Sequence, residues 1–430
     1  MIMQKKDEKL NRRNFLKTIG AVGVGSLFSS TSAKGAVDEP MDSTSSPRNE
    51  TVSKKELSEH VPRRKLGKTG VEVPCLAMGL MSSLLDNQIL LRKSLDFGVN
   101  YWDTSNGYAG GNSERGIGKF FANNPNLRKN VFLVTKASGA RTVADVEKRL
   151  STSFERMNTD YIDMYCGVHG LSSASQLTDE LRKWTEDAKK KGKIRFFGFS
   201  MHENMAENLT AALKLDWIDA IMTSYNFRFM LKPELDLAVD ACHKAGIGLI
   251  AMKTQGKPVW EIKTEADKWV LTEAEKKLTE HLLKQGFSLA QANIKIVADK
   301  PWFSSVCVGM NDVAVLRENV AVSLNKTKLT DADLAAYRQY AEATCSGYCA
   351  GCSNICKDVL PDMPYVSEIM RYLMYHNSYG DKERARELFA HLPQKVRANL
   401  LNVDYSTAED RCPQRMPIGK FMAEAATKLA

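Results

Sequence analysis

Short apolar runs alternate with longer amphipathic stretches along the chain from Arg63 onward. Eight of these runs have the length and composition of buried strands, and they begin at Val73, Asn100, Val131, Tyr161, Ile194, Ala220, Ile247 and Ser305. The stretches between them, such as VADVEKRLSTSFERM and KPELDLAVDACHKAG, carry apolar residues at helical spacings of three and four. Repeated strand–helix units predict an α/β fold, a (β/α)8 TIM barrel. An open doubly wound sheet is the alternative, which the lack of a Gly-x-Gly-x-x-Gly turn after the first strand weakens.

The first residues of the chain have the pattern of an export signal. A basic, polar segment precedes an apolar stretch from Phe15 to Phe28, which is too short and too weakly apolar for a stable membrane span. The run NRRNFLK resembles the twin-arginine export motif. We therefore predict a signal peptide over 1–33, recognised by the twin-arginine export machinery, and a periplasmic or otherwise exported protein. The polar composition of 34–62 predicts a flexible linker.

Composition and charge set limits on the remainder of the chain. A length of 430 residues with 43% apolar content is sufficient for a barrel over 63–325 and a small helical, cysteine-rich domain over 326–430. In the second region TDADLAAYRQYAEA, VSEIMRYLMYH and KERARELFAHL predict amphipathic helices, the first capped by Thr330. The six basic and two acidic residues of 1–33 account for +4 of the formal net charge of +9. The charge that remains gives no indication of a nucleic-acid partner.

Cysteines are concentrated near the end of the chain. The run CSGYCAGCSNIC supplies four thiols, and a fifth precedes a proline in CPQRMPI, which resembles the closing half of a ferredoxin motif. Thiolates packed this densely are typical of a metal centre. We predict one [4Fe-4S] cluster whose ligands come from five candidates: Cys345, Cys349, Cys352, Cys356 and Cys412. Cys349, Cys352 and Cys412 form the core of the set, with Cys345 or Cys356 as the fourth, while a zinc knot and disulfides remain alternatives.

Polar residues stand at the ends of three consecutive predicted strands. Asp103, Lys136 and His169 hold these positions, and Tyr108 follows Asp103 by five residues. Consecutive strands of a barrel are neighbours, so these side chains are expected to meet at one mouth. A tyrosine with its ordinary pKa of about 10 exchanges protons poorly at neutral pH. We expect Lys136 to lower the pKa of Tyr108, Asp103 to hold Lys136 in its charged form, and His169 to orient a substrate carbonyl.

Four segments of the chain resemble the aldo-keto reductase family. RKLGKTGVEVPCLAMG resembles the family's opening hairpin and first strand, and GVNYWDTSNGYAGGNSERGIGK resembles its aspartate and tyrosine segment. FLVTKAS resembles its lysine strand, and YIDMYCGVHG its histidine strand. The resemblance implies a (β/α)8 barrel that passes hydride between NADP(H) and a carbonyl, with Asp103, Tyr108, Lys136 and His169 as the catalytic tetrad. A branch of this family also carries cysteine-rich, ferredoxin-like tails.

The resemblance also implies a set of cofactor contacts. These are Ser200, Tyr225, Asn226, Gly309, Met310, Asn311, Glu318 and Asn319. The match is incomplete, because Met201 and Met222 replace an asparagine and a glutamine of the family pattern. Val315 stands where many relatives have a basic residue for the 2′-phosphate. Both NADP and NAD therefore remain open as the cofactor.

Together these features predict an exported oxidoreductase that transfers hydride between a nicotinamide cofactor and a small carbonyl or hydroxyl compound, such as a sugar. A difficulty is that nicotinamide exchanges hydride, whereas an iron-sulfur cluster passes one electron at a time. Two alternatives follow. The chain could be an electron-transfer protein whose barrel docks a membrane partner, or the barrel could be a non-catalytic binding module.

Overall fold

The computed structural model describes residues 60–259, 273–284 and 286–430. The predicted signal peptide and all but the last residues of the predicted linker lie outside the described residues. Within the described part, no helix has the length and apolar character needed to cross a membrane.

The chain enters the barrel through a short antiparallel hairpin of β1 (Arg63–Lys65) and β2 (Glu72–Pro74). Its turn contains Gly67 at φ +51°, where an added Cβ would lie 2.2 Å from the carbonyl oxygen of Gly246. Only glycine accepts this combination of left-handed backbone and close approach. The opening hairpin predicted from the sequence is therefore present, and it covers one end of the barrel strands.

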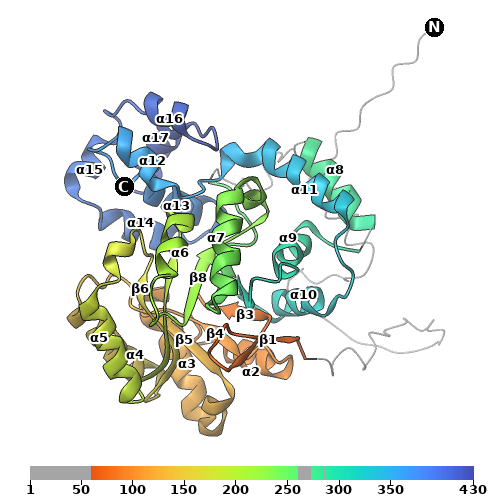
Figure 1. The fold of residues 1–430 in the computed structure, drawn as a ribbon, viewed down its shortest axis with the longest axis vertical. Coiled ribbons are helices and arrows are strands. Elements are labelled where there is room, and N and C mark those ends of the chain that lie inside the picture. Colours follow the sequence, from red (N-terminus) through yellow and green to blue (C-terminus); the bar gives the residue numbers. More distant parts are fainter. Residues whose placement is uncertain (1–59, 260–272, 285) are drawn as a thin grey trace, which may run out of the picture. The chain divides into compact units, whose positions relative to one another are not determined.

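Eight parallel strands close into a barrel in the order β10, β3, β4, β5, β6, β7, β8 and β9 (Figure 1). Each coincides with one of the eight runs expected from the sequence, β7 extending one residue further to Met201, which confirms the (β/α)8 prediction. Their bounds are β3 (Leu76–Gly79), β4 (Tyr101–Asp103), β5 (Phe132–Lys136), β6 (Ile162–His169), β7 (Ile194–Met201), β8 (Ala220–Ser224), β9 (Gly248–Met252) and β10 (Ser305–Gly309).

The barrel has two hydrophobic layers, because successive strand residues point alternately inward and outward. Tyr101, Val134 and Met164 belong to the inner layer, whereas Trp102 and Leu133 belong to the layer that packs against the helices. Burial of a large apolar side chain in such layers contributes about 1.5–3 kcal/mol each. The same alternation turns Asp103 and Lys136 inward at the ends of β4 and β5.

A β-bulge sets the direction of His169. The pairing of β6 with β7 shifts register between Cys166 and Val168, with Gly167 as the extra residue. Cys166 lies in the inner layer and Val168 packs against the outer one. A bulge re-aims the residues that follow it, so His169 pairs with Ser200 and faces the mouth.

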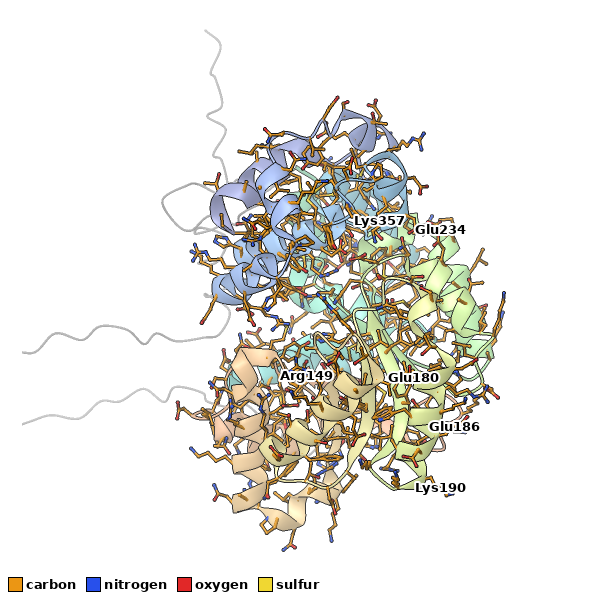
Figure 2. The ribbon with its side chains drawn as sticks, turned by 90° about the vertical axis from the view of Figure 1, so that its left-hand side faces the viewer. Arg149, Glu180, Glu186, Lys190, Glu234 and Lys357 are labelled. Carbon is orange, nitrogen blue, oxygen red and sulfur yellow. The ribbon has the colours of Figure 1, made fainter. Side chains whose placement is uncertain are left out.

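Helices with polar outer faces surround the barrel. They are α2 (Gln88–Asp96), α3 (Asn112–Asn123), α4 (Val143–Met157), α5 (Asp179–Lys190), α6 (Met205–Ala212), α7 (Pro233–Lys244), α8 (Glu273–Lys284), α9 (Leu289–Ala298) and α10 (Val313–Leu324). Figure 2 shows the exposed charged side chains of Arg149 on α4 and of Glu180, Glu186 and Lys190 on α5.

A helical tail follows the barrel. It contains α11 (Asp331–Thr344), α12 (Ser353–Val359), α13 (Val366–Met374), the π-helix η7 (Tyr375–Tyr379), α14 (Lys382–Ala390), α15 (Gln394–Asn399), α16 (Ser406–Arg411) and α17 (Ile418–Lys428). Thr330 caps α11 through a capping box, as predicted.

The tail packs on the carboxyl ends of strands β7 and β8. Asn204 Nδ2 donates to Ser353 Oγ at 2.8 Å, and the rings of Phe227 and Tyr340 stack at 4.9 Å. Gly351 lies so close to β7 that an added Cβ would come within 2.0 Å of the carbonyl oxygen of His202. The described residues of 60–259 and 274–430 accordingly belong to one compact unit. The division at 325 and 326 stays a prediction from the sequence.

Candidate active site and candidate metal centre

The four predicted catalytic side chains meet at one mouth of the barrel. Asp103, Lys136 and His169 end β4, β5 and β6, and Tyr108 begins the short helix η2 (Tyr108–Gly111). Lys136 Nζ lies 5.0 Å from the ring centroid of Tyr108, and the rings of Tyr108 and His169 meet edge to face at 5.9 Å. The expected convergence of these residue types is thus present in the structure.

Asp103 and Lys136 form a buried ion pair beneath Tyr108. The carboxylate Oδ1 lies 2.5 Å from Lys136 Nζ, which also donates to the carbonyl oxygen of Thr104 at 2.7 Å. Both side chains are almost fully buried. Burial alone would lower the pKa of Lys136, but the Asp103 carboxylate and smaller effects of Tyr108 and Cys166 together outweigh it, so that the pKa is raised. Lys136 therefore remains a cation, as predicted.

The pKa of Tyr108 differs from the prediction. Burial raises it to about 12 and outweighs the opposing effect of the Lys136 ammonium. Tyr108 is only 8% exposed, and loss of hydration disfavours the phenolate. The sequence indicated that Lys136 would act on Tyr108, but it did not indicate how deeply the Tyr108 side chain is buried. Tyr108 is therefore a protonated phenol, which is the form that donates a proton.

His169 is held as a neutral imidazole. Burial lowers its pKa first, and the charges of Lys136 and Arg384 lower it further. Its Nδ1 lies 2.6 Å from Ser138 Oγ and 3.4 Å from Ser105 Oγ. When Nδ1 accepts the Ser138 hydroxyl, Nε2 carries the proton and can donate it in a hydrogen bond. Both serines were missed from the sequence, although each follows a strand-end tetrad residue by two positions.

The tail adds a side chain that sequence reasoning also missed. Arg384 on α14 places its Cζ 5.1 Å from the ring centroid of Tyr108, on which Lys136 also acts. Its Nη1 donates to the carbonyl oxygen of Gly107 at 3.2 Å. No local motif connects residue 384 with residue 108, so only the fold shows that α14 returns to the barrel mouth.

Several predicted cofactor residues have positions suited to a dinucleotide. Ser200 is buried on β7 and its Oγ accepts the backbone N–H of Gly170 at 3.2 Å. Gly309 ends β10, Met310 is buried after it, and Asn311 is exposed beside Ser82, with the two side-chain oxygens 3.5 Å apart.

Asn319 provides the test of whether this part of the site fits a dinucleotide. Its side chain is buried on α10, yet Nδ2 has no hydrogen-bond partner within the described residues. A buried amide left without a partner costs about 1–3 kcal/mol, so a bound acceptor, such as a ring nitrogen of adenine, suits it. The side chain of Glu318, its neighbour, is exposed.

Two predicted cofactor residues, Tyr225 and Asn226, make contacts within the protein, and their contact with a cofactor stays a prediction from the family pattern. Tyr225 packs against Phe303, with ring centroids 5.0 Å apart, and its hydroxyl hydrogen-bonds to Asp236. Asn226 accepts the N–H of Arg228 at 3.1 Å and caps η5 (Phe227–Leu231). The family pattern gives the residue types but not the direction in which they point.

Four of the five candidate cysteines surround one cavity in the tail. Cys349, Cys352, Cys356 and Cys412 line this cavity, together with Pro413 and apolar side chains of α13. The thiol of Cys349 lies close enough to the other three for their charges to act on it. Lys232 and Glu234, which flank the start of α7, are near enough for their charges to act on the thiol of Cys352. Figure 2 shows Glu234 and Lys357 in this region.

Cys345 lies apart from this group. It begins η6 (Cys345–Gly347), and its Sγ points to the carbonyl oxygen of Glu342 at 3.3 Å. All nine cysteines are within the described ranges, and none forms a disulfide. Among the described residues, no three His, Cys, Asp or Glu side chains are grouped to hold a single metal ion. The four thiols line the walls of a cavity and do not converge on one point.

Comparison with known proteins identifies the family. Residues 83–342 match the sequence model of the aldo/keto reductase family, which is more than half of the chain. The chain belongs to the aldo/keto reductase family. It is therefore an enzyme of the oxidoreductase class, as predicted from the tetrad segments.

Individual relatives of this aldo/keto reductase are distant. L-galactose dehydrogenase of Arabidopsis thaliana is 25% identical over 281 residues, 60% of this chain and 86% of that protein. L-glyceraldehyde 3-phosphate reductase of Escherichia coli is 24% identical over 328 residues, 64% of this chain and 91% of that protein. The aldo-keto reductase AKR11C1 from Bacillus halodurans, solved in a holo form, shares the fold with a TM-score of 0.53 at 21% identity, covering 65% of this chain and 96% of that one.

Proposed function

We propose that this aldo/keto reductase transfers hydride between a nicotinamide cofactor and a small carbonyl or hydroxyl compound, such as a sugar. The observation that carries the proposal is the convergence of Tyr108, the Lys136–Asp103 pair and His169 at the barrel mouth. Named relatives that act on sugars and sugar phosphates support it. A non-catalytic barrel is disfavoured because the mouth retains every part of an acid–base site.

Each residue has a definite task in carbonyl reduction. The cofactor, when bound, supplies the hydride. His169 in its neutral form donates a hydrogen bond to the substrate carbonyl and positions it. Tyr108, a protonated phenol with a pKa of about 12, gives its proton to the developing alkoxide. Lys136, charged and fixed by Asp103, stabilises the phenolate that remains.

The residues that would hold the dinucleotide are Ser200, Gly309, Asn311 and Asn319. The turn after β10 differs from a site built for a 2′-phosphate, because residues 309–316 contain no lysine or arginine. Its exposed Asp312 also caps α10, with Oδ1 accepting the N–H of Val315 at 2.9 Å. A carboxylate at this place would repel the extra phosphate of NADP.

The chain is accordingly expected to favour NADH. We expect kcat/KM with NADH to exceed that with NADPH by roughly tenfold, the effect of about 1.4 kcal/mol of repulsion. Steady-state assays with both nicotinamides and a panel of small aldehydes and sugars measure the ratio. Asp312→Asn keeps a side chain that can cap α10 but removes the negative charge. It should therefore reduce the ratio of kcat/KM with NADH to kcat/KM with NADPH. Tighter use of NADPH by the wild-type protein would contradict the assignment, and absence of turnover with either would contradict the proposed reaction.

We propose further that Cys349, Cys352, Cys356 and Cys412 hold one [4Fe-4S] cluster. Four thiols around one cavity, the last of them followed by a proline, are the type and number of ligands that an iron-sulfur cube requires. This choice takes Cys356 as the fourth ligand in place of Cys345. The cluster, when bound, supplies one-electron transfer.

An observation also favours a second candidate function, electron transfer with a membrane partner. Cys349 lines the thiol cavity and also a neighbouring cavity that includes His202 and Lys253 at the mouth. A cluster held there would lie beside the substrate region, as an electron relay requires.

We also propose export by the twin-arginine machinery, on the basis of the NRRNFLK run. This route carries folded proteins and so suits a chain that is loaded with a cluster in the cytoplasm. In the full chain, replacement of Arg12 and Arg13 by lysine is expected to leave most of the protein in the cytoplasmic fraction, measured by immunoblotting of fractions. Equal amounts of periplasmic protein with and without the substitutions would refute the proposal.

A further inference from the structure

Three basic side chains reach the mouth from parts of the chain beyond the tetrad strands. Lys253 follows β9, Arg371 lies on α13 and Arg384 lies on α14. All three are near enough to act on His169. Arg371 is neutralised by Glu203, with Nη1 and Oε1 3.1 Å apart. Within the described part of the chain, Lys253 and Arg384 have no carboxylate at ion-pair distance.

Arg384 is fixed beside the predicted proton donor. It stacks near the ring of Tyr108, at 5.1 Å from the guanidinium carbon to the centroid, and Nη1 is anchored on the carbonyl oxygen of Gly107. Its Nε is buried and finds no hydrogen-bond partner among the described residues. A buried charged group without a partner is costly unless a ligand satisfies it. The Arg384 side chain is therefore anchored through Nη1, while its Nε–H remains available to a ligand.

Lys253 is held in an unusual conformation at the mouth, near enough to Arg384 for the two charges to interact. Its backbone is left-handed, with φ +62°, although it is not glycine. Nζ lies 4.3 Å and 4.4 Å from the ring centroids of Tyr375 and Tyr379, the two ends of the π-helix η7. The lysine lines a cavity with His202 and Ser224. Strained residues and π-helical turns both concentrate at functional sites.

The charges of this region are unbalanced. Asp103 and Glu203 are each held by another cation, in the Asp103–Lys136 and Glu203–Arg371 pairs, and Glu368 also acts on Arg371. Burial would raise the pKa of Tyr375, yet Lys253 and the two arginines outweigh it and lower the pKa. The mouth thus has a positive field that the described residues do not neutralise.

We propose that Lys253 and Arg384 form an anion subsite beside Tyr108, so that the substrate is a small carbonyl or hydroxyl compound carrying a carboxylate or a phosphate. The inference rests on the proposed oxidoreductase function and specifies its substrate class. A carboxylate or phosphate fits a guanidinium and an ammonium through charge-assisted hydrogen bonds. Lys253 hydrogen-bonds to Tyr375 and Arg384 to Gly107, but a neutral sugar would give neither cation an anionic partner.

The test compares matched pairs of substrates that differ in the charged group. D-glucuronate is paired with D-glucose, and D-glyceraldehyde 3-phosphate with D-glyceraldehyde, in NADH-linked assays of the cluster-loaded enzyme. We expect kcat/KM for the charged member of at least one pair to exceed that of the neutral member roughly 10- to 100-fold, as hydrogen bonds to charged groups predict. Preference in the first pair identifies a sugar acid and in the second a sugar phosphate.

Variants assign the preference to the two side chains. Arg384→Gln and Lys253→Gln should each reduce the charged-to-neutral ratio about tenfold, the effect of losing one charge-assisted contact. Lys382→Gln, on the exposed face of the same helix α14, removes a charge away from the mouth and should leave the ratio unchanged. Melting temperatures show which variants are folded, and either mouth variant alone is sufficient for the test.

The results separate this inference from the proposed function. Turnover of both members of each pair at equal kcat/KM overturns the anion subsite and leaves the oxidoreductase in place. Absence of turnover with every substrate overturns the oxidoreductase, and calorimetric titration of D-glucuronate and of D-glyceraldehyde 3-phosphate then decides the subsite. Binding to the wild-type protein that Arg384→Gln abolishes supports it, and absence of binding of both compounds overturns it.

Discussion

Replacement of Tyr108 by phenylalanine is expected to lower kcat for nicotinamide-linked carbonyl reduction by roughly 100- to 10,000-fold, the usual contribution of general acid catalysis. The substitution removes only the hydroxyl that would protonate the developing alkoxide. The ring contacts with His169 and Arg384 remain, so substrate and cofactor binding should change little. Steady-state kcat and KM with NADH, together with the affinity for the nicotinamide measured by fluorescence titration, check both parts of this expectation.

Tyr165→Phe is the matched control. Tyr165 is also buried, but it lies between the barrel and its helices, and its hydroxyl donates to the carbonyl oxygen of Val146 at 3.0 Å. Loss of that bond costs roughly 1 kcal/mol of stability and should leave turnover near the wild-type rate. If Tyr108→Phe retains wild-type kcat, Tyr108 is not the proton donor and the proposed reaction at this mouth is wrong.

Serine in place of any one of Cys349, Cys352, Cys356 and Cys412 is expected to reduce the iron and sulfide of anaerobically purified protein from about four of each per chain to below one. Each substitution removes a soft thiolate from the wall of the cavity and leaves an incomplete ligand set. The melting temperature should fall as well, because a bound centre contributes its binding free energy to the folded state. Iron and sulfide assays, absorbance near 400 nm and thermal unfolding measure the effect.

Cys345→Ser is the control that distinguishes a cysteine at the cavity from one that only belongs to the cysteine run. It lies in the same cysteine run but outside the cavity, so it should retain the full iron content. If Cys345→Ser loses the cluster and Cys356→Ser keeps it, the ligand set is wrong. Stoichiometric zinc in place of iron and sulfide would refute the cluster itself.

Much of the fold and of the catalytic centre could be predicted because local patterns encode them. Strand and helix periodicities identified all eight barrel strands. The neighbour relation of consecutive strands was sufficient to bring Asp103, Lys136 and His169 together. These inferences need only the order of elements and the alternation of side chains along a strand.

The remaining features depend on distances that no local pattern contains. The raised pKa of Tyr108 follows from how much of its ring is covered. The position of Arg384 beside Tyr108 follows from the return of α14 to the barrel mouth. The proposal of Cys356, and not Cys345, as the fourth cluster ligand follows from where the loop places each thiol. Tyr225 and Asn226 match a family pattern, yet packing and helix capping occupy them.

The contact of Gly351 with His202 limits what can be inherited from the relatives. The match to the family covers residues 83–342. Arg371, Tyr375 and Arg384 come from beyond that region, in the tail that packs against the barrel at Gly351. The family region thus supplies Tyr108, Lys136 and His169 at the mouth, whereas the tail supplies Arg371, Tyr375 and Arg384. A substrate preference that depends on the tail is therefore a property of this chain's own entrance and not of the barrel alone.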